Sequence, residues 1–599
     1  MEATTTRTAA WGVAPGYHDI DGRWVAADRD TVDRVLAAMG ADGDAPAPAR
    51  VRVVRSGEPL ALPAASEVVT EDGAVLAAAE AGAAGLPNGY HTLRSIDGGA
   101  ETRLIVSPGC CHLPPGLSAW GWAAQLYALR SRRSWGLGDL ADLRELGRWA
   151  TGLGARALFV NPLYAPLPAV PQEPSPYYPL SRRFRSPLYI RVEEVPGASA
   201  LGERLAGLAA AGRALNGSRL IDRDAVYRLK MPALEELFEA FPGGRGFDRF
   251  RRAEGGDLED YAVFCALSEV HGVPWHDWPA ELRHPRSRAV CHFRMAHERR
   301  VRFHEWLQWI LDRQLAAAAG EIGLVHDLPV GVQADGADAW TWQDLFARGV
   351  SVGAPPDPFN RAGQDWAVPP FDPWRLRAAG YEPFIRTVRA GFRHGVGLRV
   401  DHVMGLFRLF WIPAGNGPTE GLYVRYPHRD LLDILALESE RAGAFVVGED
   451  LGTVEDVVRD DMAARHILSY RLLWFEERPP AEYRAESLAA LTTHDLPTLA
   501  GIWEGSDPDV QVLARLRRHA GVGDGRRTCE VAEAAYRALA GSPSKLLAAT
   551  LEDALGVAER PNKPGTTSEW PNWSLALPVS LDDLRRDPRP ARLAAVLRR

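Results

Sequence analysis

The sequence predicts an α/β protein built around a closed (β/α)8 TIM barrel. From residue 118 onward, short apolar runs typical of buried strands alternate with amphipathic helical stretches, about eight times in all. This alternation implies a parallel sheet, and eight repeats indicate a sheet that closes on itself. The length of 599 residues leaves room for a barrel with large insertions. A doubly wound open sheet is the alternative.

The barrel elements can be placed along the chain in order. The strands are predicted at residues 122–129, 155–160, 324–332, 396–400, 444–447, 468–475, 488–491 and 546–550. Amphipathic helices are predicted between them, for example at 139–151, 382–393 and 431–442. A large and mainly helical insertion at 164–319 separates the second and third strands. The proline-rich segment 355–371 is interpreted as a stiff lid loop.

Residues 1–113 differ from the rest and predict a small β-rich accessory region. One helix is expected at 28–39, followed by short strands at 51–54, 75–78, 91–95 and 102–106. Pro114-Pro115-Gly116 is a suitable boundary, so the barrel with its insertions is assigned to 114–599.

Composition excludes several classes of protein. With 69 Lys+Arg against 77 Asp+Glu, the net charge of −8 argues against a nucleic-acid binder and against a polybasic membrane-surface protein. The sequence contains no apolar run of about 18 residues, so no membrane span is expected. Five cysteines and an N-terminus without a signal pattern indicate a reducing, cytoplasmic setting. The oligomeric state is left open.

Two other patterns predict structure rather than a cofactor or a metal site. Gly136-Leu137-Gly138-Asp139-Leu140-Ala141 matches a loose dinucleotide fingerprint, but no acidic residue ends the next strand, so Asp139 is expected to cap a helix. Six histidines lie between residues 271 and 304 without the i, i+4 spacing of a helical metal site. We therefore expect no cofactor and no metal.

Three acidic residues follow predicted barrel strands four, five and seven: Asp401, Glu449 and Asp495. Barrel enzymes collect their chemistry at this rim. Arg399 lies two residues before Asp401 and therefore points the same way, which favours an ionised Asp401. One ionised and one protonable carboxyl group are what glycosidic bond cleavage requires.

The sequence resembles the amylomaltases, or 4-α-glucanotransferases, of glycoside hydrolase family seventy-seven, in the long bacterial type with an N-terminal extension. The motifs that carry the resemblance run in family order over about 120–580: SPYY at 175–178, SPLYI at 186–190, AD at 334–335, PPD at 355–357, GQxW at 363–366, RVDH at 399–402, GEDLG at 448–452, TTHDLPT at 492–498 and NKPGTTSEWPNW at 562–573. Residues 11–41 are similar to the extension itself.

The resemblance implies retaining transfer of an α-1,4-glucan segment to the 4-hydroxyl of an acceptor glucan or glucose, without a cofactor. It implies that Asp401 is the nucleophile, Glu449 the general acid/base and Asp495 the third carboxylate. It further implies that substrate is contacted by Arg399, His494, Tyr177, Asp335, Asp357, Gln364 and Trp366. The implied partners are malto-oligosaccharides, glucose, and glycogen or starch.

This sequence departs from the family pattern in the predicted lid, where Pro358 replaces a usual Tyr and Ala367 a usual Gly. The alternatives are an α-amylase-like retaining hydrolase, which would use the same residues with water as acceptor, and a glucan-binding protein without activity. The intact set of three carboxylates argues against the binding protein.

Overall fold

The structure is a computed structural model that describes residues 7–19, 22–46, 49–99, 101–356, 360–452 and 454–598. The chain divides into two compact units. The first comprises Met1–Pro115 with Trp342–Ser469, and the second Gly116–Thr341 with Tyr470–Arg599. Among the described helices, none is both long enough and apolar enough to cross a membrane.

The central sheet is a closed barrel whose strands pair in chain order, with the last strand beside the first. The first and second strands of the barrel pair in parallel, and so do the eighth and the first. This confirms the predicted (β/α)8 barrel and excludes the open sheet. The eight strands are β8 (Ala119–Ala124), β9 (Ala157–Val160), β10 (Gly323–Leu328), β13 (Gly397–Val400), β16 (Phe445–Gly448), β17 (Ile467–Leu472), β18 (Ser487–Ala490) and β19 (Leu546–Thr550).

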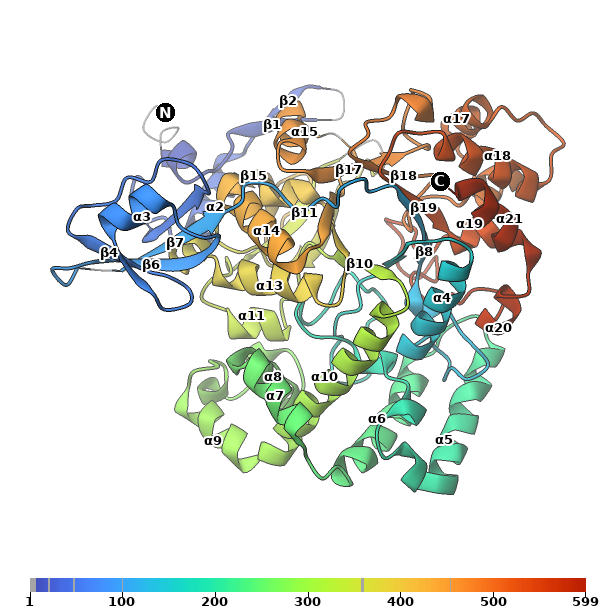
Figure 1. Cartoon of the computed structure of the whole chain (residues 1–599), viewed down its shortest axis with the longest axis horizontal. Coiled ribbons are helices and arrows are strands. Elements are labelled where there is room, and N and C mark those ends of the chain that lie inside the picture. The colour runs from blue at the N-terminus through green and yellow to red at the C-terminus, as the bar shows by residue number, and fades with distance from the viewer. Residues whose placement is uncertain are drawn as a thin grey trace. The chain divides into compact units, whose positions relative to one another are not determined.

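The second unit holds the mainly helical insertion between β9 and β10, as predicted. Its long helix α10 (Glu298–Ala319) packs on α8 (Gly256–His271) and on the barrel helix α4 (Leu140–Gly152). In Figure 1, α8 and α10 are drawn in green and α4 in cyan. The other insertion helices are α5 (Gly202–Ala214), α6 (Arg223–Glu239), α7 (Arg245–Glu254) and α9 (Arg288–Ala296). The remaining helices of the unit are α11 (Ala337–Thr341), α16 (Leu499–Glu504), α17 (Val510–Ala520), α18 (Thr528–Ala540), α19 (Leu551–Leu555), α20 (Leu581–Leu584) and α21 (Pro588–Leu597).

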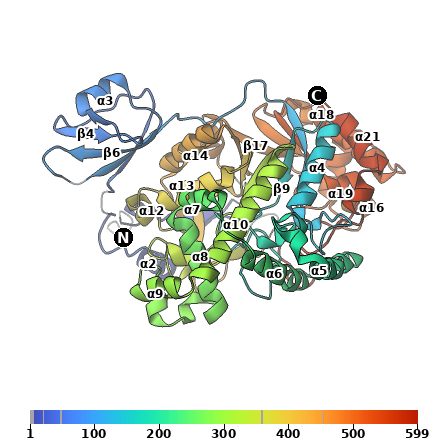
Figure 2. The same ribbon diagram turned by 60° about the horizontal axis from the view of Figure 1, so that its bottom comes forward.

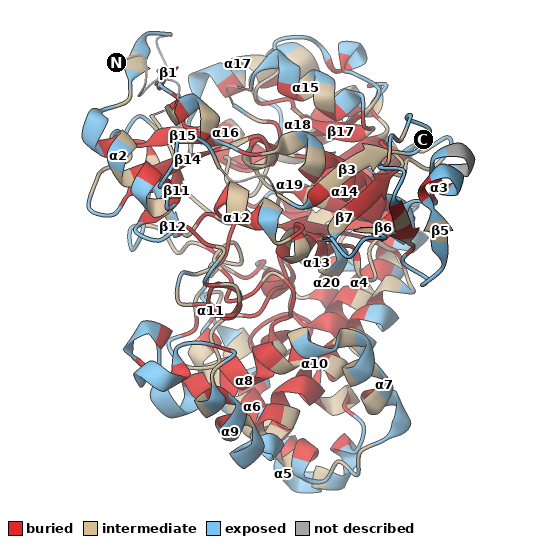
Figure 3. Cartoon of the chain, turned by 90° about the vertical axis from the view of Figure 1, so that its left-hand side faces the viewer, coloured by how far each residue is buried: buried red, intermediate tan, exposed pale blue. Residues whose placement is uncertain are grey.

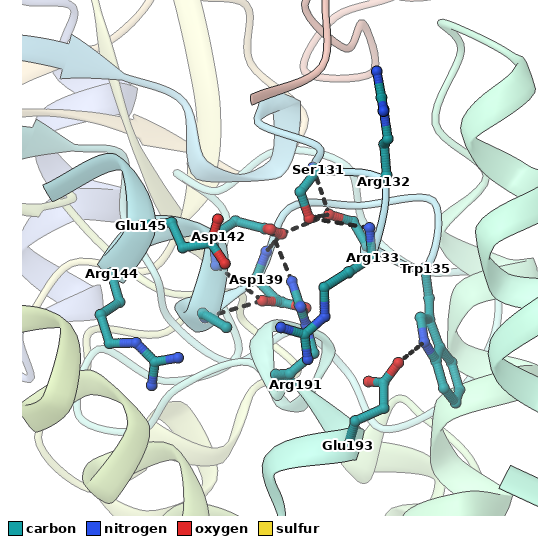
Figure 4. Close-up of polar contacts among 12 residues, drawn as sticks. Ser131, Arg132, Arg133, Trp135, Asp139, Asp142, Arg144, Glu145, Arg191 and Glu193 are labelled. Atoms are coloured by element: carbon teal, nitrogen blue, oxygen red, sulfur yellow. Dashed lines mark hydrogen bonds and ion pairs between the residues drawn. The ribbon is translucent and has the colours of Figure 1, made fainter. Parts of the chain in front are cut away.

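A buried ionic cluster joins the start of α4 to the insertion (Figure 4). Asp139 caps α4 as predicted, because its carboxylate accepts hydrogen bonds from the Ala141 and Asp142 N–H groups. The guanidinium of Arg191 lies 2.5 Å from Asp139 and 2.8 Å from Asp142, and all three side chains are at most 1% exposed. Burial, followed by the charge of Asp139, raises the pKa of Asp142 to about 6. Ser134 donates a further hydrogen bond to Asp142.

The first unit contains the predicted β-rich N-terminal region as a five-stranded sheet in the order β3-β7-β6-β4-β5. Figure 2 labels β4 and β6 of this sheet, drawn in blue. Its strands are β3 (Val51–Arg55), β4 (Ser66–Val69), β5 (Val75–Ala77), β6 (Gly89–Ser95) and β7 (Thr102–Ser107), with helix α3 (Ala78–Ala84) after β5. The strand β4 was not predicted. The helix predicted at 28–39 is α2 (Arg29–Ala38), capped by the Asp28 side chain.

The N-terminal sheet packs against α14 (His428–Ala442), a barrel helix of the same unit, through β3 and β7 (Figure 3). Arg55 pairs with Asp433 at 3.1 Å. The Tyr90 hydroxyl donates to Glu438 at 2.6 Å, and the Ser107 hydroxyl donates to the Asp433 carbonyl at 2.6 Å. Arg55 and Tyr90 thus add partners to two largely buried acidic side chains of α14, which also pair with Arg465 and Arg389. The other helices of the unit are α12 (Pro373–Ala378), α13 (Glu382–Phe392) and α15 (Asp456–Ala463).

A second sheet of the first unit corrects the predicted loop at 355–371. Residues Gln364–Val368 form the edge strand β12, which pairs with β11 (Val350–Ala354) in an antiparallel sheet. The sheet continues through β14 (Arg408–Pro413) and β15 (Leu422–Arg425), and the short hairpin β1 (Gly16–His18) and β2 (Trp24–Ala26) belongs to the same unit. This strand was not predicted because it begins with the polar residues Gln364 and Asp365 and is therefore not an apolar run. An edge strand has a solvent-facing side, so polar residues suit it.

Candidate active site

Asp401 follows barrel strand β13 and forms an ion pair with Arg399. The guanidinium Nη1 lies 3.0 Å from Asp401 Oδ1, and the two side chains are 12% and 21% exposed. Both residues point the same way, as the two-residue spacing predicts, because alternate side chains of a strand share a face. A guanidinium at this distance favours the ionised carboxylate.

Glu449 follows the neighbouring strand β16, which pairs in parallel with β13. Its carboxylate accepts a hydrogen bond from the Leu451 N–H at 2.7 Å and another from the His402 N–H at 3.0 Å. Burial and then the charge of Asp401 raise the pKa of Glu449 to about 7, while Arg399 and the two N–H groups oppose that rise. A carboxyl group with this pKa can both donate and accept a proton near neutral pH.

His402 connects this pair to the edge strand β12. The residue adopts a left-handed conformation with φ of 45°, and its ring meets the Trp366 indole edge-on at 5.2 Å between centroids. The Trp366 Nε1–H donates to the Gln364 side chain at 3.3 Å. Burial and the charge of Arg408 lower the pKa of His402 to about 4, so its ring is neutral at physiological pH.

Ala367 explains why the family pattern favours glycine beside Trp366. Its φ of 55° lies in the left-handed region, which glycine adopts more easily than alanine. The Asp365 carboxylate accepts a hydrogen bond from the Ala367 N–H at 2.8 Å and thereby supports the turn.

The second unit groups Tyr177, His494 and Asp495 within itself. The Tyr177 and His494 rings stack at 4.9 Å, and His494 Nε2 lies 3.4 Å from Asp495 Oδ2. The Tyr177 hydroxyl donates to Asp327 at 2.5 Å, and the Asn562 amide donates to Asp495 at 2.7 Å. The Asp495 side chain is 43% exposed, so it remains open to a ligand.

Two of the predicted binding residues are not joined to these groups by any contact described above. Asp335 is half exposed and lies 3.4 Å from His276. Asp357 lies outside the described residues.

Sequence reasoning did not nominate Asp327, His402, Asn562 or Trp573 as site residues. Trp573 packs on both Tyr177 and His494, at 5.3 Å and 5.2 Å. Asn562 and Trp573 could have been found, since both lie in the motif at 562–573. Asp327 is buried near the carboxyl end of strand β10, next to His326. It lies inside the predicted strand and not after it, so it was not singled out, although a His-Asp pair near the end of a barrel strand could have indicated it.

Among the residues that the structure describes, no group of three or more His, Cys, Asp or Glu side chains is arranged to hold a metal ion.

Acidic side chains that follow the strands of a closed (β/α)8 barrel form the arrangement typical of barrel enzymes, whose active sites lie at this end of the strands. The chain belongs to the 4-alpha-glucanotransferase family, glycoside hydrolase family 77, whose profile matches residues 124–580. This confirms the family that the sequence motifs indicated.

Known relatives agree with this membership. The 4-alpha-glucanotransferase of Mycobacterium tuberculosis H37Rv is 43% identical over 86% of this chain and 80% of the relative. The 4-alpha-glucanotransferase of Haemophilus influenzae is 33% identical over 83% of this chain and 79% of the relative. The crystal structure of amylomaltase from Corynebacterium glutamicum matches with a TM-score of 0.88 and 31% identity, covering 100% of both chains. The chain is therefore an enzyme of the 4-alpha-glucanotransferase type.

Proposed function

We propose that the enzyme transfers an α-1,4-glucan segment from a donor malto-oligosaccharide to the 4-hydroxyl of an acceptor glucan or glucose, with retention of configuration. The observation that carries the proposal is the pair Asp401 and Glu449. One carboxylate is paired with Arg399, and the other has a pKa of about 7. These are the two protonation states that a retaining glycosyl transfer needs. The names of the relatives support glucans as substrates.

In the first step, Asp401 attacks the anomeric carbon while Glu449 gives its proton to the departing glycosidic oxygen. The bond between sugar and leaving glucan breaks, and an ester bond to Asp401 forms. The leaving glucan then departs with its new 4-hydroxyl, and Glu449 remains as the carboxylate.

In the second step, the 4-hydroxyl of an acceptor gives its proton to Glu449 and attacks the same carbon, which frees Asp401. Two displacements restore the α configuration. We assign Asp495 as the third carboxylate, which binds sugar hydroxyls, supported by its exposure and by the Asn562 amide that orients it. Tyr177 and His494 are proposed to bind the same sugar.

Incubation with maltotriose tests the proposal. A transferase yields a series of longer and shorter glucans with no net gain of reducing ends. If maltotriose gives only glucose and maltose with a matching gain of reducing ends, the enzyme is a hydrolase. Unchanged maltotriose at high enzyme concentration would indicate a binding protein.

The pH profile reports on Glu449. We expect kcat/KM for maltotriose to fall about tenfold per pH unit above pH 7, because Glu449 must be protonated to donate and its pKa is about 7. The control is α-maltosyl fluoride, whose fluoride leaving group needs little help from a proton. Its glycosyl-enzyme formation should fall much less over the same range. An equal fall for both donors would show that another group causes the alkaline limb.

Trp366 is expected to favour the glucan acceptor over water. Trp366→Ala should raise the ratio of new reducing ends to transferred glucan about fivefold, because the indole offers a flat face worth about 1 kcal/mol to a sugar ring. Product partition from maltotriose at matched conversion measures the ratio. Trp24→Ala is the control, since Trp24 is 52% exposed on the N-terminal hairpin. A lower total rate with an unchanged ratio would contradict a role in acceptor choice.

A further inference from the structure

The residue after the proposed nucleophile makes two contacts that differ in kind. The backbone N–H of His402 donates to Glu449 Oε2 at 3.0 Å. The imidazole ring, in contrast, meets the Trp366 indole at 5.2 Å and an interplanar angle of 79°. A single residue therefore touches both the candidate acid/base and the aromatic side chain of β12.

The backbone conformation at His402 makes this double contact possible. Its φ of 45° and ψ of 63° place it in the left-handed region, directly before the short turn Val403–Leu406. Residues other than glycine enter this region at a cost, although Asn, Asp and His do so more often than most. The neighbouring backbone is fixed by two further hydrogen bonds, from the Glu449 N–H to the Val400 carbonyl and from the Val403 N–H to the Glu449 carbonyl.

We propose that His402 is a positioning residue: the contact of its ring with Trp366 holds the left-handed turn, and the turn directs the 402 N–H at the Glu449 carboxylate. The proposal deepens the proposed function, since it rests on Glu449 as acid/base. Its effect is on the proton affinity of Glu449, because an N–H donor stabilises the ionised form. Within the first unit, the charged groups that act on Glu449 are Asp401 and Arg399, and Arg408 acts on the His402 ring.

The proposal predicts the sign of a pKa change. If the ring contact is lost, the turn relaxes, the N–H leaves the carboxylate and the pKa of Glu449 rises by about one pH unit. If the rings only covered Glu449 from water, their removal would instead lower that pKa, because burial raises it. The two explanations therefore give opposite signs.

The experiment is an infrared titration of the Glu449 carboxyl group, obtained as the difference from Glu449→Gln, in wild type, His402→Asn, His402→Phe, Trp366→Ala and the His402→Asn/Trp366→Ala double variant. Asn is the better residue for a left-handed backbone, whereas Phe keeps an aromatic ring for Trp366. We expect the pKa to rise in His402→Asn and in Trp366→Ala, to rise no further in the double variant, and to stay near the wild-type value in His402→Phe.

His394→Asn is the matched control, since His394 is also partly buried and left-handed, with φ of 58°. In this variant, the pKa of Glu449 should equal the pKa of Glu449 in the wild type. Circular dichroism and Tm check folding, and if His402→Asn does not fold, Trp366→Ala alone decides the sign. A fall or no change in pKa, additive shifts in the double variant, or a larger shift in Phe than in Asn would each overturn the proposal.

The titration needs no turnover, so it separates this proposal from the proposed function. If maltotriose is not disproportionated, the function fails while the pKa shifts can still be read. If disproportionation is normal and the shifts are absent, only the role of His402 fails. In an active enzyme, the alkaline limb of kcat/KM should move to higher pH in His402→Asn, together with the pKa of Glu449. Substitution of a residue with a purely structural role would not shift this limb.

Discussion

Asp401→Ala and Glu449→Gln are each expected to lower kcat for maltotriose by about 10⁴-fold or more, because residues that act as one catalytic unit fail together. Both side chains are partly exposed beyond the ends of their strands, so the fold should persist. Steady-state assays with Tm as a folding check measure the effect. Asp460→Asn, at an exposed position of α15, is the control and should stay within about twofold of wild type.

Azide can separate the two roles. With α-maltosyl fluoride as donor, Glu449→Ala should still form the ester on Asp401, which azide then attacks to give the α-azide. In Asp401→Ala, azide can only displace fluoride directly, which gives the β-azide. Products of the same configuration from both variants, or a variant that keeps a tenth of the wild-type rate, would show that a role is assigned to the wrong residue.

Arg191→Met is expected to cause the largest loss of stability, about 3–5 kcal/mol, because it leaves Asp139 and Asp142 buried without their cation. Differential scanning calorimetry should show a Tm lower by several degrees. Arg148→Met is the matched control: Arg148 pairs with Glu321 at 2.6 Å but is 62% exposed. Its loss should not exceed about 1 kcal/mol.

The pH dependence of this loss has a definite sign. The folded pKa of Asp142 is already raised to about 6, above its ordinary value of 3.8, so its ionisation opposes folding as pH rises. Without Arg191 this opposition grows. The Tm deficit of Arg191→Met should therefore be smaller at pH 5 than at pH 8, and Asp139→Asn with Asp142→Asn should restore part of it. A deficit that is independent of pH would indicate lost packing rather than unpaired charge.

The parts of the fold that the sequence predicts are those that depend on short-range pattern. Barrel strands such as β16 and β19 are apolar runs followed by helices. Asp139 was predictable as a cap because Asp is common directly before the first turn of a helix. The candidate carboxylates were predictable because each follows such a strand. The predicted strand at 122–129 was too long: β8 ends at Ala124, and a turn of 3-10 helix covers Leu126–Ala128.

The features that escaped prediction depend on contacts between distant residues or on the backbone. The strand β12 is defined by its partner β11, and its own residues are too polar to reveal it. The N–H groups of His402 and Leu451 that bind Glu449 leave no trace in side-chain identity. Asp327 resembles an interruption of an apolar strand until Tyr177, 150 positions earlier in the chain, is seen to bind it.

The N-terminal sheet packs on α14, a helix that is synthesised much later, so this packing can form only late in translation. Arg55 and Asp433 are 378 positions apart, and the second unit supplies most of the chain between them. At about 5–20 residues per second, a ribosome needs roughly 20–75 s to pass from one to the other. During that interval, β3 and β7 are synthesised but α14 does not exist. The face of the sheet that α14 later covers therefore stays without this partner until α14 has been synthesised.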